Sequence, residues 1–200
     1  MTDEKDALVD AFAIAVIALV SLVGLKSVYD GIGVMIVGSV GIAAGIVLGW
    51  LVRRAGLSAL STLGLFSVVY VVASGPALPD DSIAGILPGP QTPSALLNGL
   101  IHSWPDLVTT APPAGLGAGL GVVPYTCGFV GAGLAMLLAR KTARPLLPAL
   151  PLLLVLMASF VLGTVEPFST MIQGGLFALM ALGWAAVRAN RSRRSTDGTI

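Results

Sequence analysis

Six apolar stretches, each near the length needed to cross a lipid bilayer, constrain this chain more than any other feature. A helix rises about 1.5 Å per residue, so about 20 residues cross the hydrocarbon core. The chain of 200 residues is 56% hydrophobic and 10% charged, whereas soluble domains carry about 25% charged residues. We therefore predict an all-α membrane protein, a bundle of six transmembrane helices. The expected spans are residues 7–25, 33–52, 57–74, 116–139, 147–164 and 169–187.

The basic residues predict the orientation of this bundle, because positive charge collects on the cytoplasmic side of membrane proteins. With a cytoplasmic N-terminus, only Lys26 of the eleven basic residues falls outside. The others lie before the first span or at the cytoplasmic ends: Lys5, Arg53, Arg54, Arg140, Lys141, Arg144, Arg188, Arg191, Arg193 and Arg194. Trp50 and Trp184 precede such ends by roughly one turn, where indoles favour the interface. We expect a multi-pass protein of the plasma (inner) membrane with both termini in the cytoplasm.

The same pattern divides the chain into two parts. Residues 1–189 form the helical membrane domain, in which residues 75–115 make a long outer loop. Residues 190–200 are a basic, polar cytoplasmic tail, expected to be irregular or to lie along anionic headgroups. Since the basic residues fit the topology, the lipid bilayer is the expected partner and nucleic acid is not.

Glycines at four-residue spacing predict close helix packing in the second span. Gly41, Gly45 and Gly49 form two overlapping G-x-x-x-G patterns on one face. Lipid tails are as apolar as leucine, so membrane helices associate through close van der Waals contact, which small residues permit. We expect this face to pack within the chain, because six helices offer many internal partners. A dimer face is the alternative interpretation.

Two other features bear on the later spans. Pro124 lies inside the expected fourth span and should kink it, freeing the carbonyl four residues earlier. Tyr125, Thr126 and Cys127 beside such a kink would line a cavity, although a kink is more often only shape. At the sixth span, Thr170-x-x-Gln173 matches a capping box.

The outer loop contains a short amphipathic helix in this interpretation. Thr92 is the expected N-cap, with Pro93 at the first helical position. An apolar stripe of helical period follows: Leu96, Leu97, Leu100, Ile101, Trp104, Leu107 and Val108. Pro105 should end or bend the helix near Ser103. We expect this segment to lie at the outer interface or to fold back over the bundle, with Trp104 as an interfacial anchor.

His102, Trp104 and Asp106 are the candidate residues of the outer face. His102 and Asp106 are four residues apart and would face the same way only if the helix continued through Pro105. No serine or cysteine nucleophile is paired with them, and no second histidine offers a metal site. We therefore predict no catalytic, cofactor-binding or metal-binding residues. Four other acids make the outer face mildly anionic: Asp30, Asp80, Asp81 and Glu166.

No charged residue lies deep within any expected span, and Asp10 lies at the margin of the first. Proton and ion relays need ionisable groups at membrane depth. A proton-coupled pump is therefore disfavoured.

Part of the chain resembles a known family. The run HSWPDLVTTAPP, followed by GLGVVPYTCGFVGAGLAMLLARKTARPLLPALPLLLVLMASFVLG, resembles the N-terminal membrane region of actinobacterial transglutaminase-like proteins of the TgpA type. The resemblance covers roughly residues 75–165. It consists of a tryptophan-containing outer segment, a Thr-Thr-x-x-Pro-like turn, a Val-Pro entering the next span, a basic turn, and a span rich in leucine and proline.

The resemblance implies a membrane anchor or scaffold module without a catalytic centre. In that family an arginine-rich cytoplasmic turn, another span and an extracytoplasmic domain with a Cys-His-Asp triad follow the bundle, and none of the triad can be assigned to this sequence. Cys127 is in a span, and His102 is not in a catalytic motif of the family. The implied partners are that C-terminal domain and other cell-envelope proteins, with no cofactor. The alternatives are a small transporter or lipid-handling permease and, third, an intramembrane enzyme using His102 and Asp106.

Overall fold

Helices account for most of the chain in the computed structural model, which describes residues 2–29, 31–109, 114–117, 119–142, 144–163 and 167–197. The α-helices are α1 (Thr2–Leu22), α2 (Gly33–Ala55), α3 (Ala59–Val72), α4 (Thr92–Thr109), α5 (Val122–Lys141), α6 (Leu150–Leu162) and α7 (Pro167–Asp197). Short 3-10 turns are η1 (Val23–Ser27), η2 (Gly75–Ala77), η3 (Pro79–Asp81) and η4 (Leu147–Ala149). Strands β1 (Ser82–Ile83) and β2 (Leu87–Pro88) pair antiparallel, with Ile83 opposite Leu87. The predicted all-α class is confirmed.

Four helices of the described chain are long and apolar enough to cross a membrane: Glu4–Ser27, Gly33–Ala55, Val122–Lys141 and Thr170–Arg191. The third and fifth expected spans also form apolar helices, but α3 has 14 residues and α6 has 13. At 1.5 Å per residue, 14 residues reach about 21 Å, which is less than the hydrocarbon core. Local sequence sets these lengths. Ser58 caps α3 by accepting a bond from the Ser61 amide, and α6 begins only after the proline-containing turn η4.

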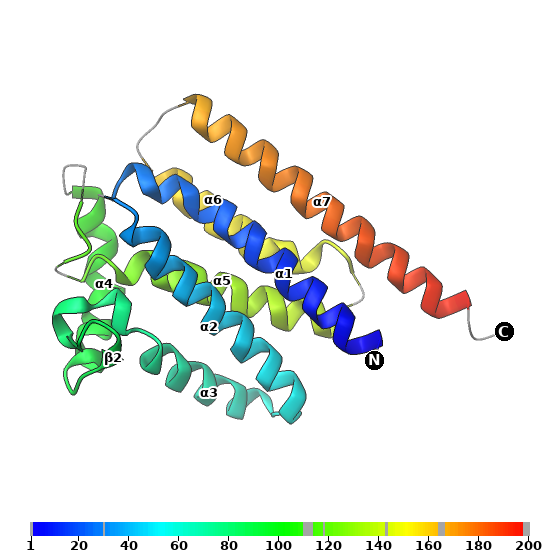
Figure 1. The fold of residues 1–200 in the computed structure, drawn as a ribbon, viewed down its shortest axis with the longest axis horizontal. Helices are drawn as coiled ribbons and strands as arrows, with labels where there is room; N and C mark the ends of the chain where they lie inside the picture. The colour runs from blue at the N-terminus through cyan, green and yellow to red at the C-terminus, as the bar shows by residue number, and fades with distance from the viewer. Residues whose placement is uncertain are drawn as a thin grey trace.

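The six apolar helices lie along a common direction, with α4 and β2 at one end of the bundle (Figure 1). The start of α1 and the end of α7 lie at the opposite end (Figure 1). α5 is the central helix, because it packs against α1, α2, α4 and α6, whereas α7 packs chiefly on α1 and η1. Thus the segment that contains α4 covers one end of a bundle built around α5.

The contact between α2 and α5 is made by the glycine face. Gly41 packs against the backbone of Tyr125 and Phe129, and Gly45 packs against the Phe129 carbonyl. A Cβ at Gly45 would also lie 2.8 Å from the Gly133 amide nitrogen. A Cβ at Gly49 would lie 2.8 Å from Met136 Cβ. This face therefore packs within the chain, where only glycine permits the backbones to approach so closely.

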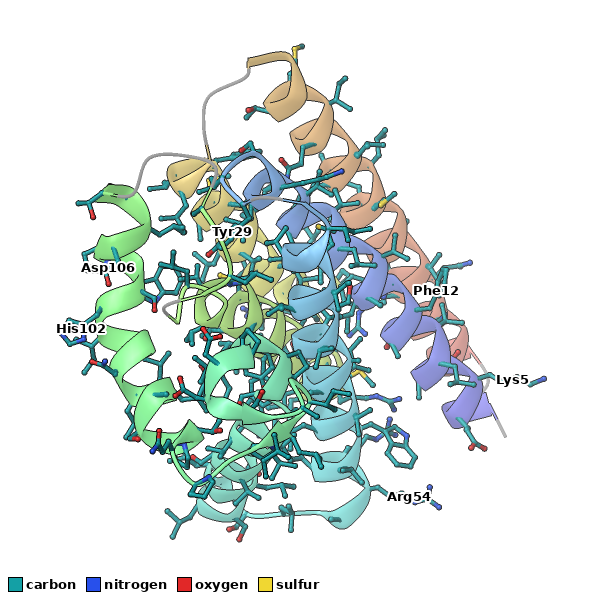
Figure 2. All side chains as sticks on the ribbon, turned by 60° about the vertical axis from the view of Figure 1, so that its left-hand side comes forward. Lys5, Phe12, Tyr29, Arg54, His102 and Asp106 are labelled. Atoms are coloured by element: carbon teal, nitrogen blue, oxygen red, sulfur yellow. The ribbon has the colours of Figure 1, made fainter. Side chains whose placement is uncertain are left out.

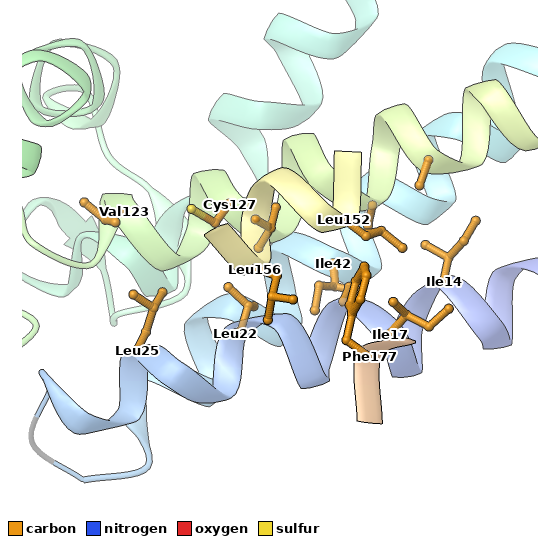
Figure 3. Close-up of a cluster of buried hydrophobic side chains, with 14 of the residues drawn as sticks. Ile14, Ile17, Leu22, Leu25, Ile42, Val123, Cys127, Leu152, Leu156 and Phe177 are labelled. Carbon is orange, nitrogen blue, oxygen red and sulfur yellow. The ribbon is translucent and has the colours of Figure 1, made fainter. Parts of the chain in front are cut away.

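Two groups of packed side chains, one buried and one with partly buried members, adjoin α5. The larger one joins α1, η1, α2, α5, α6 and α7 (Figure 3) and includes Ile14, Ile17, Leu22, Leu25, Ile42, Val123, Cys127, Leu152, Leu156 and Phe177. The other is aromatic and joins α3 to α5 through Phe66, Tyr70, Tyr125 and Phe129. In it, Tyr125 Oη donates to the Tyr70 carbonyl at 2.7 Å, and the Tyr70 and Thr126 hydroxyls are 2.6 Å apart.

The kink expected at Pro124 is wrong. α5 begins at Val122, so Pro124 lies in its first turn, where the missing N–H removes no intrahelical hydrogen bond. Tyr125 is fully buried and Cys127 is 8% exposed, because both pack between helices. Tyr125, Thr126 and Cys127 therefore belong to helix contacts rather than to the wall of a cavity at a kink.

The start and end of the last helix also differ from expectation. α7 begins at Pro167, so Thr170 lies inside it and the capping box is wrong. Gln173 Nε2 instead donates to the Val20 and Ser21 carbonyls of α1, at 2.8 and 3.2 Å. At the other end α7 continues through Asp197, so the tail expected to be irregular is helical over that length.

Candidate functional site

The candidate site lies in the segment that the sequence predicts to face outward; we call its described residues between Gly75 and Gly121 the outer cap, after that expectation. Its main element, α4, runs unbroken through Pro105, so the expected end near Ser103 is wrong. Pro105 is on the exposed face, whereas Gly99, Ser103 and Leu107 are buried on the other. A Cβ at Gly99 would lie 2.8 Å from Val122 Cγ2 of α5. Packing of this buried face on α5 therefore stabilises the helix enough to offset the hydrogen bond that proline removes.

Thr92 fixes the start of α4 to the preceding hairpin. α4 begins at Thr92 itself, so this threonine is the first helical residue and not the expected N-cap, and Pro93 is the second helical residue. Its buried hydroxyl donates to the Asp81 carbonyl at 2.8 Å and accepts from the Gly89 amide at 2.8 Å. The acidic turn η3 is thereby held beside the first turns of α4.

This arrangement creates a pocket of about 270 Å³. It is lined by Leu78, Pro79, Asp80, Asp81, Ala95, Asn98, Gly99, His102, Ser103, Asp106 and Gly119. His102 and Asp106 lie one turn apart on the same side of α4, directed away from the bundle (Figure 2). The structure therefore places two of the three outer-face candidates, His102 and Asp106, in one pocket with two further carboxylates, Asp80 and Asp81.

The electrostatics of the pocket favour a cationic group. Three aspartates line it, and the sequence contains no lysine or arginine between Arg54 and Arg140. The Nδ1 atom of His102 lies 3.1 Å from the Asn98 carbonyl. Like charges held together attract a counter-ion or a basic partner. Of the four other acids expected on the outer face, Asp80 and Asp81 line this pocket, whereas Asp30 and Glu166 lie outside the described residues.

The described residues of this pocket do not form a nucleophilic site. Ser103 is 2% exposed, and its Oγ donates to the Gly119 carbonyl at 2.9 Å. Its hydroxyl is thus engaged in joining α4 to the segment before α5, with no histidine as its base. In the part of the chain that the structure describes, no group of three or more His, Cys, Asp or Glu side chains could hold a metal ion.

Trp104, the third candidate, does not face the pocket. It is partly buried and packs on the large cluster around α5. The expected interfacial anchor is therefore in contact with the protein core, because the unbroken α4 turns its apolar side toward α5.

The outer cap is also tied to the end of α1. Tyr29 Oη donates to the Leu120 carbonyl at 2.8 Å, and the Ala114 amide donates to the Val28 carbonyl at 2.7 Å. Tyr29 is 3% exposed (labelled in Figure 2). Burial raises the pKa of its hydroxyl above the ordinary value near 10. The hydroxyl therefore stays protonated, and continues to donate, at pH values where an exposed tyrosine would ionise.

Tyr29→Phe is expected to lower the free energy of unfolding by about 0.5–1.5 kcal/mol, the net value of one hydrogen bond. The loss is moderate because the Leu120 carbonyl also accepts from the Val123 amide at 3.3 Å. Equilibrium unfolding in detergent measures it. The matched control is Ser82→Ala, which removes an exposed hydroxyl–carbonyl bond of 3.2 Å and should change stability less. Equal effects of the two variants would contradict this role for Tyr29.

A second polar cluster, at the opposite end of the bundle, was not predicted from the sequence. Asp10 Oδ1 accepts from Trp184 Nε1 at 3.0 Å, and Asp10 Oδ2 accepts from Arg188 Nη1 at 2.9 Å. Arg188 Nη2 donates to the Ala139 and Thr142 carbonyls at the end of α5. We call Asp10, Trp184 and Arg188 the inner clamp, after the orientation that the sequence predicts. It joins α1, α5 and α7.

Two sequence signals for the inner clamp existed. Asp10 is an isolated acid in an apolar run, and Trp184 and Arg188 are four residues apart, on one face of α7. Trp184 packs between helices, because the residue is 5% exposed and its N–H is used by Asp10. Trp50 is 37% exposed, and the Arg54 guanidinium lies 5.0 Å from its ring centroid.

Comparisons with known proteins add no relative: no family model, curated protein or solved structure matches this chain.

Proposed function

We propose that this chain is the integral membrane anchor and scaffold module of a cell-envelope transglutaminase-like protein. In this proposal six helices cross the plasma membrane, both ends of the chain are cytoplasmic, and the outer cap faces away from the cell. The module holds an extracytoplasmic domain or partner at the membrane surface and has no catalytic centre of its own.

The arrangement of the helices supports the six-span topology. The shorter α3 and α6 lie alongside the four long helices (Figure 1). The apolar stretches that contain these helices are longer than the helices themselves, since residues 57–74 and 147–164 contain no charged residue. A bilayer accommodates such short spans by local thinning at modest cost. The inner clamp brings the basic ends of α5 and α7 beside the first turns of α1, as expected if these ends share the cytoplasmic side.

The observation that carries the scaffold proposal is the attachment of the outer cap to the bundle. The Tyr29 hydroxyl donates to the Leu120 carbonyl of the cap, and the Ala114 amide of the cap donates to the Val28 carbonyl. Gly99 of α4 packs against Val122 of α5. The cap is thus fixed both to the segment after α1 and to α5, which suits a platform more than a moving gate.

The permease alternative loses its main support. That alternative depended on a kink at Pro124 with Tyr125 and Thr126 beside a cavity. In the structure α5 starts only two residues before Pro124, and Tyr125 is buried. We therefore do not propose transport.

The test is made on the full natural protein. If the chain is an anchor, a transglutaminase-like domain is encoded in the same reading frame or beside it. That domain should then co-purify with residues 1–189 from detergent-solubilised membranes, as one polypeptide or as a complex. The absence of such a domain, or its failure to co-purify, would contradict the proposal.

A further inference from the structure

The helix α4 has more apolar surface than the bundle covers. Its buried positions fall on one side of the helix and are Thr92, Leu96, Gly99, Ser103 and Leu107. Beside them lie three large aliphatic side chains, Leu97, Ile101 and Val108, which are 64%, 68% and 69% exposed. At 100° per residue these three fall within an arc of about 40°. We call Leu97, Ile101 and Val108 the apolar flank of α4.

The other flank of α4 is polar. Asn98, His102 and Asp106 repeat at four-residue spacing and line the pocket of the outer cap. His102 and Asp106 point away from the bundle (Figure 2). Ser94 and Thr109 are also exposed on the polar side. The helix therefore separates an apolar side from a polar side, and the bundle covers only part of the apolar side.

The position of α4 brings its two flanks to different surroundings. At one point α4 meets the last turn of α3 and the first residue of α5, in a cluster of Leu78, Leu96 and Val122 with Tyr70, Val71, Ala95 and Leu100. In Figure 1 the helix accordingly runs across the end of the bundle rather than along it. Where α3 and α5 span the bilayer, a helix across their ends lies in the plane of the membrane interface.

The apolar flank continues the outer surface of α3. Every residue of α3 is at least partly exposed, and Val68 and Val72 near its end are 58% and 57% exposed. Leu100 packs in the same cluster as Val71, and on the helix it lies between the buried side of α4 and the apolar flank. The sequence contains no charged residue from 55 to 79 or at the flank positions. Lipid around α3 therefore extends to the apolar flank of α4.

We propose that the apolar flank of α4 is seated in the acyl-chain boundary of the outer leaflet, while the polar flank and its pocket face water. This inference rests on the membrane location and orientation in the proposed function. A protein partner fits the flank less well, because stable interfaces use about 20–30 residues on each side and the flank offers three. Since α4 contains no lysine or arginine, apolar contact holds it and anionic lipid is not required.

Single cysteines on the two sides of α4 test this seating. We would label Ile101→Cys and its neighbour His102→Cys with an environment-sensitive fluorophore, in phosphatidylcholine nanodiscs, where both membrane faces are open to the solution. The unsubstituted protein gives the background, since Cys127 is buried. Brominated acyl chains should quench the label at Ile101→Cys several-fold more than the label at His102→Cys. Aqueous iodide should quench them in the reverse order.

A second pair and a change of lipid complete the test. Leu97→Cys and Asn98→Cys are also adjacent on opposite sides of α4, so they should repeat the result if one of the first variants does not fold. Brominated phosphatidylglycerol should quench the Ile101→Cys label no more than brominated phosphatidylcholine does. A several-fold increase with the anionic lipid would contradict seating by apolar contact.

The outcomes separate this inference from the proposed function. A label at Val68→Cys reports membrane embedding of α3, because Val68 is exposed. Bromine quenching at Val68→Cys, with equal iodide quenching at Ile101→Cys and His102→Cys, would overturn the seating and leave the membrane location intact. Protection of Ile101→Cys from both quenchers would overturn it in favour of a protein cover, which disulfide dimerisation would identify as a second copy. The lack of bromine quenching at Val68→Cys would contradict the membrane location itself.

Discussion

Arg188→Met is expected to lower the free energy of unfolding by about 3 kcal/mol, the low end of the cost of breaking a buried ion pair, because the buried Asp10 carboxylate keeps only Arg191, at 3.4 Å, as a cationic partner. Asp10 is 6% exposed, and its Oδ2 atom lies 2.9 Å from Arg188 Nη1. The substitution also removes the donors that bind the Ala139 and Thr142 carbonyls, so the end of α5 loses its link to α7. Equilibrium unfolding in detergent, followed by circular dichroism, measures the loss.

Two comparisons identify the cause of this loss. Arg54→Met removes an exposed arginine whose contact is with the Trp50 ring, and should cost about 0.5–1 kcal/mol. Adding Asp10→Leu to Arg188→Met removes the carboxylate as well and should restore part of the stability. A cost for Arg188→Met no larger than that for Arg54→Met would show that the inner clamp does not stabilise the bundle.

Gly45→Leu should cost about 3 kcal/mol or more, or prevent folding, because the new side chain would enter the backbone contact between α2 and α5. The atoms in its way are the Phe129 carbonyl and the Gly133 amide, which cannot rotate aside as a side chain would. Gly45→Ala should already cost about 1–3 kcal/mol. The same unfolding measurement, together with the yield of monodisperse protein, gives the result.

Gly64→Leu is the matched control for this prediction. Gly64 lies in the apolar helix α3, and a Cβ there would meet no atom within 4 Å. This variant should change stability by about 0.5 kcal/mol or less. If both leucine variants were equally stable, the α2–α5 contact would not be the tight packing described above.

The glycine face shows which features could be predicted from the sequence. Gly41, Gly45 and Gly49 indicated close packing because their spacing is local and its physical meaning is direct. The six apolar stretches likewise located helices. Their lengths were less accurate, since the ends of α3 and α6 depend on capping and on proline-containing turns rather than on hydropathy.

The proline effects depended on tertiary structure. Pro105 was expected to end a helix, but the buried face of α4 outweighs one missing hydrogen bond. Pro124 was expected to kink a helix, but the position of the helix start made it harmless. Sequence alone gives the local cost of a proline and not the packing that opposes it.

The polar clusters were harder still to predict, because they join residues distant in sequence. The outer pocket brings Asp80 and Asp81 of η3 to His102 and Asp106 of α4 through a hairpin fixed by Thr92. The inner clamp joins Asp10 to Arg188, at opposite ends of the chain. Only pairs one turn apart on a single helix, such as His102 and Asp106 or Trp184 and Arg188, could be proposed as neighbours.

Labelling with a membrane-impermeant thiol reagent tests the central claim, that the bundle crosses the membrane with both ends inside and the cap outside. Ile86→Cys places a thiol in the cap, at a residue 67% exposed, and Lys5→Cys places one on an exposed position of α1. The unsubstituted protein is the background, since Cys127 is buried. In intact cells Ile86→Cys should be labelled at once, and Lys5→Cys only after permeabilisation. Labelling of Lys5→Cys in intact cells, or protection of Ile86→Cys, would contradict the account.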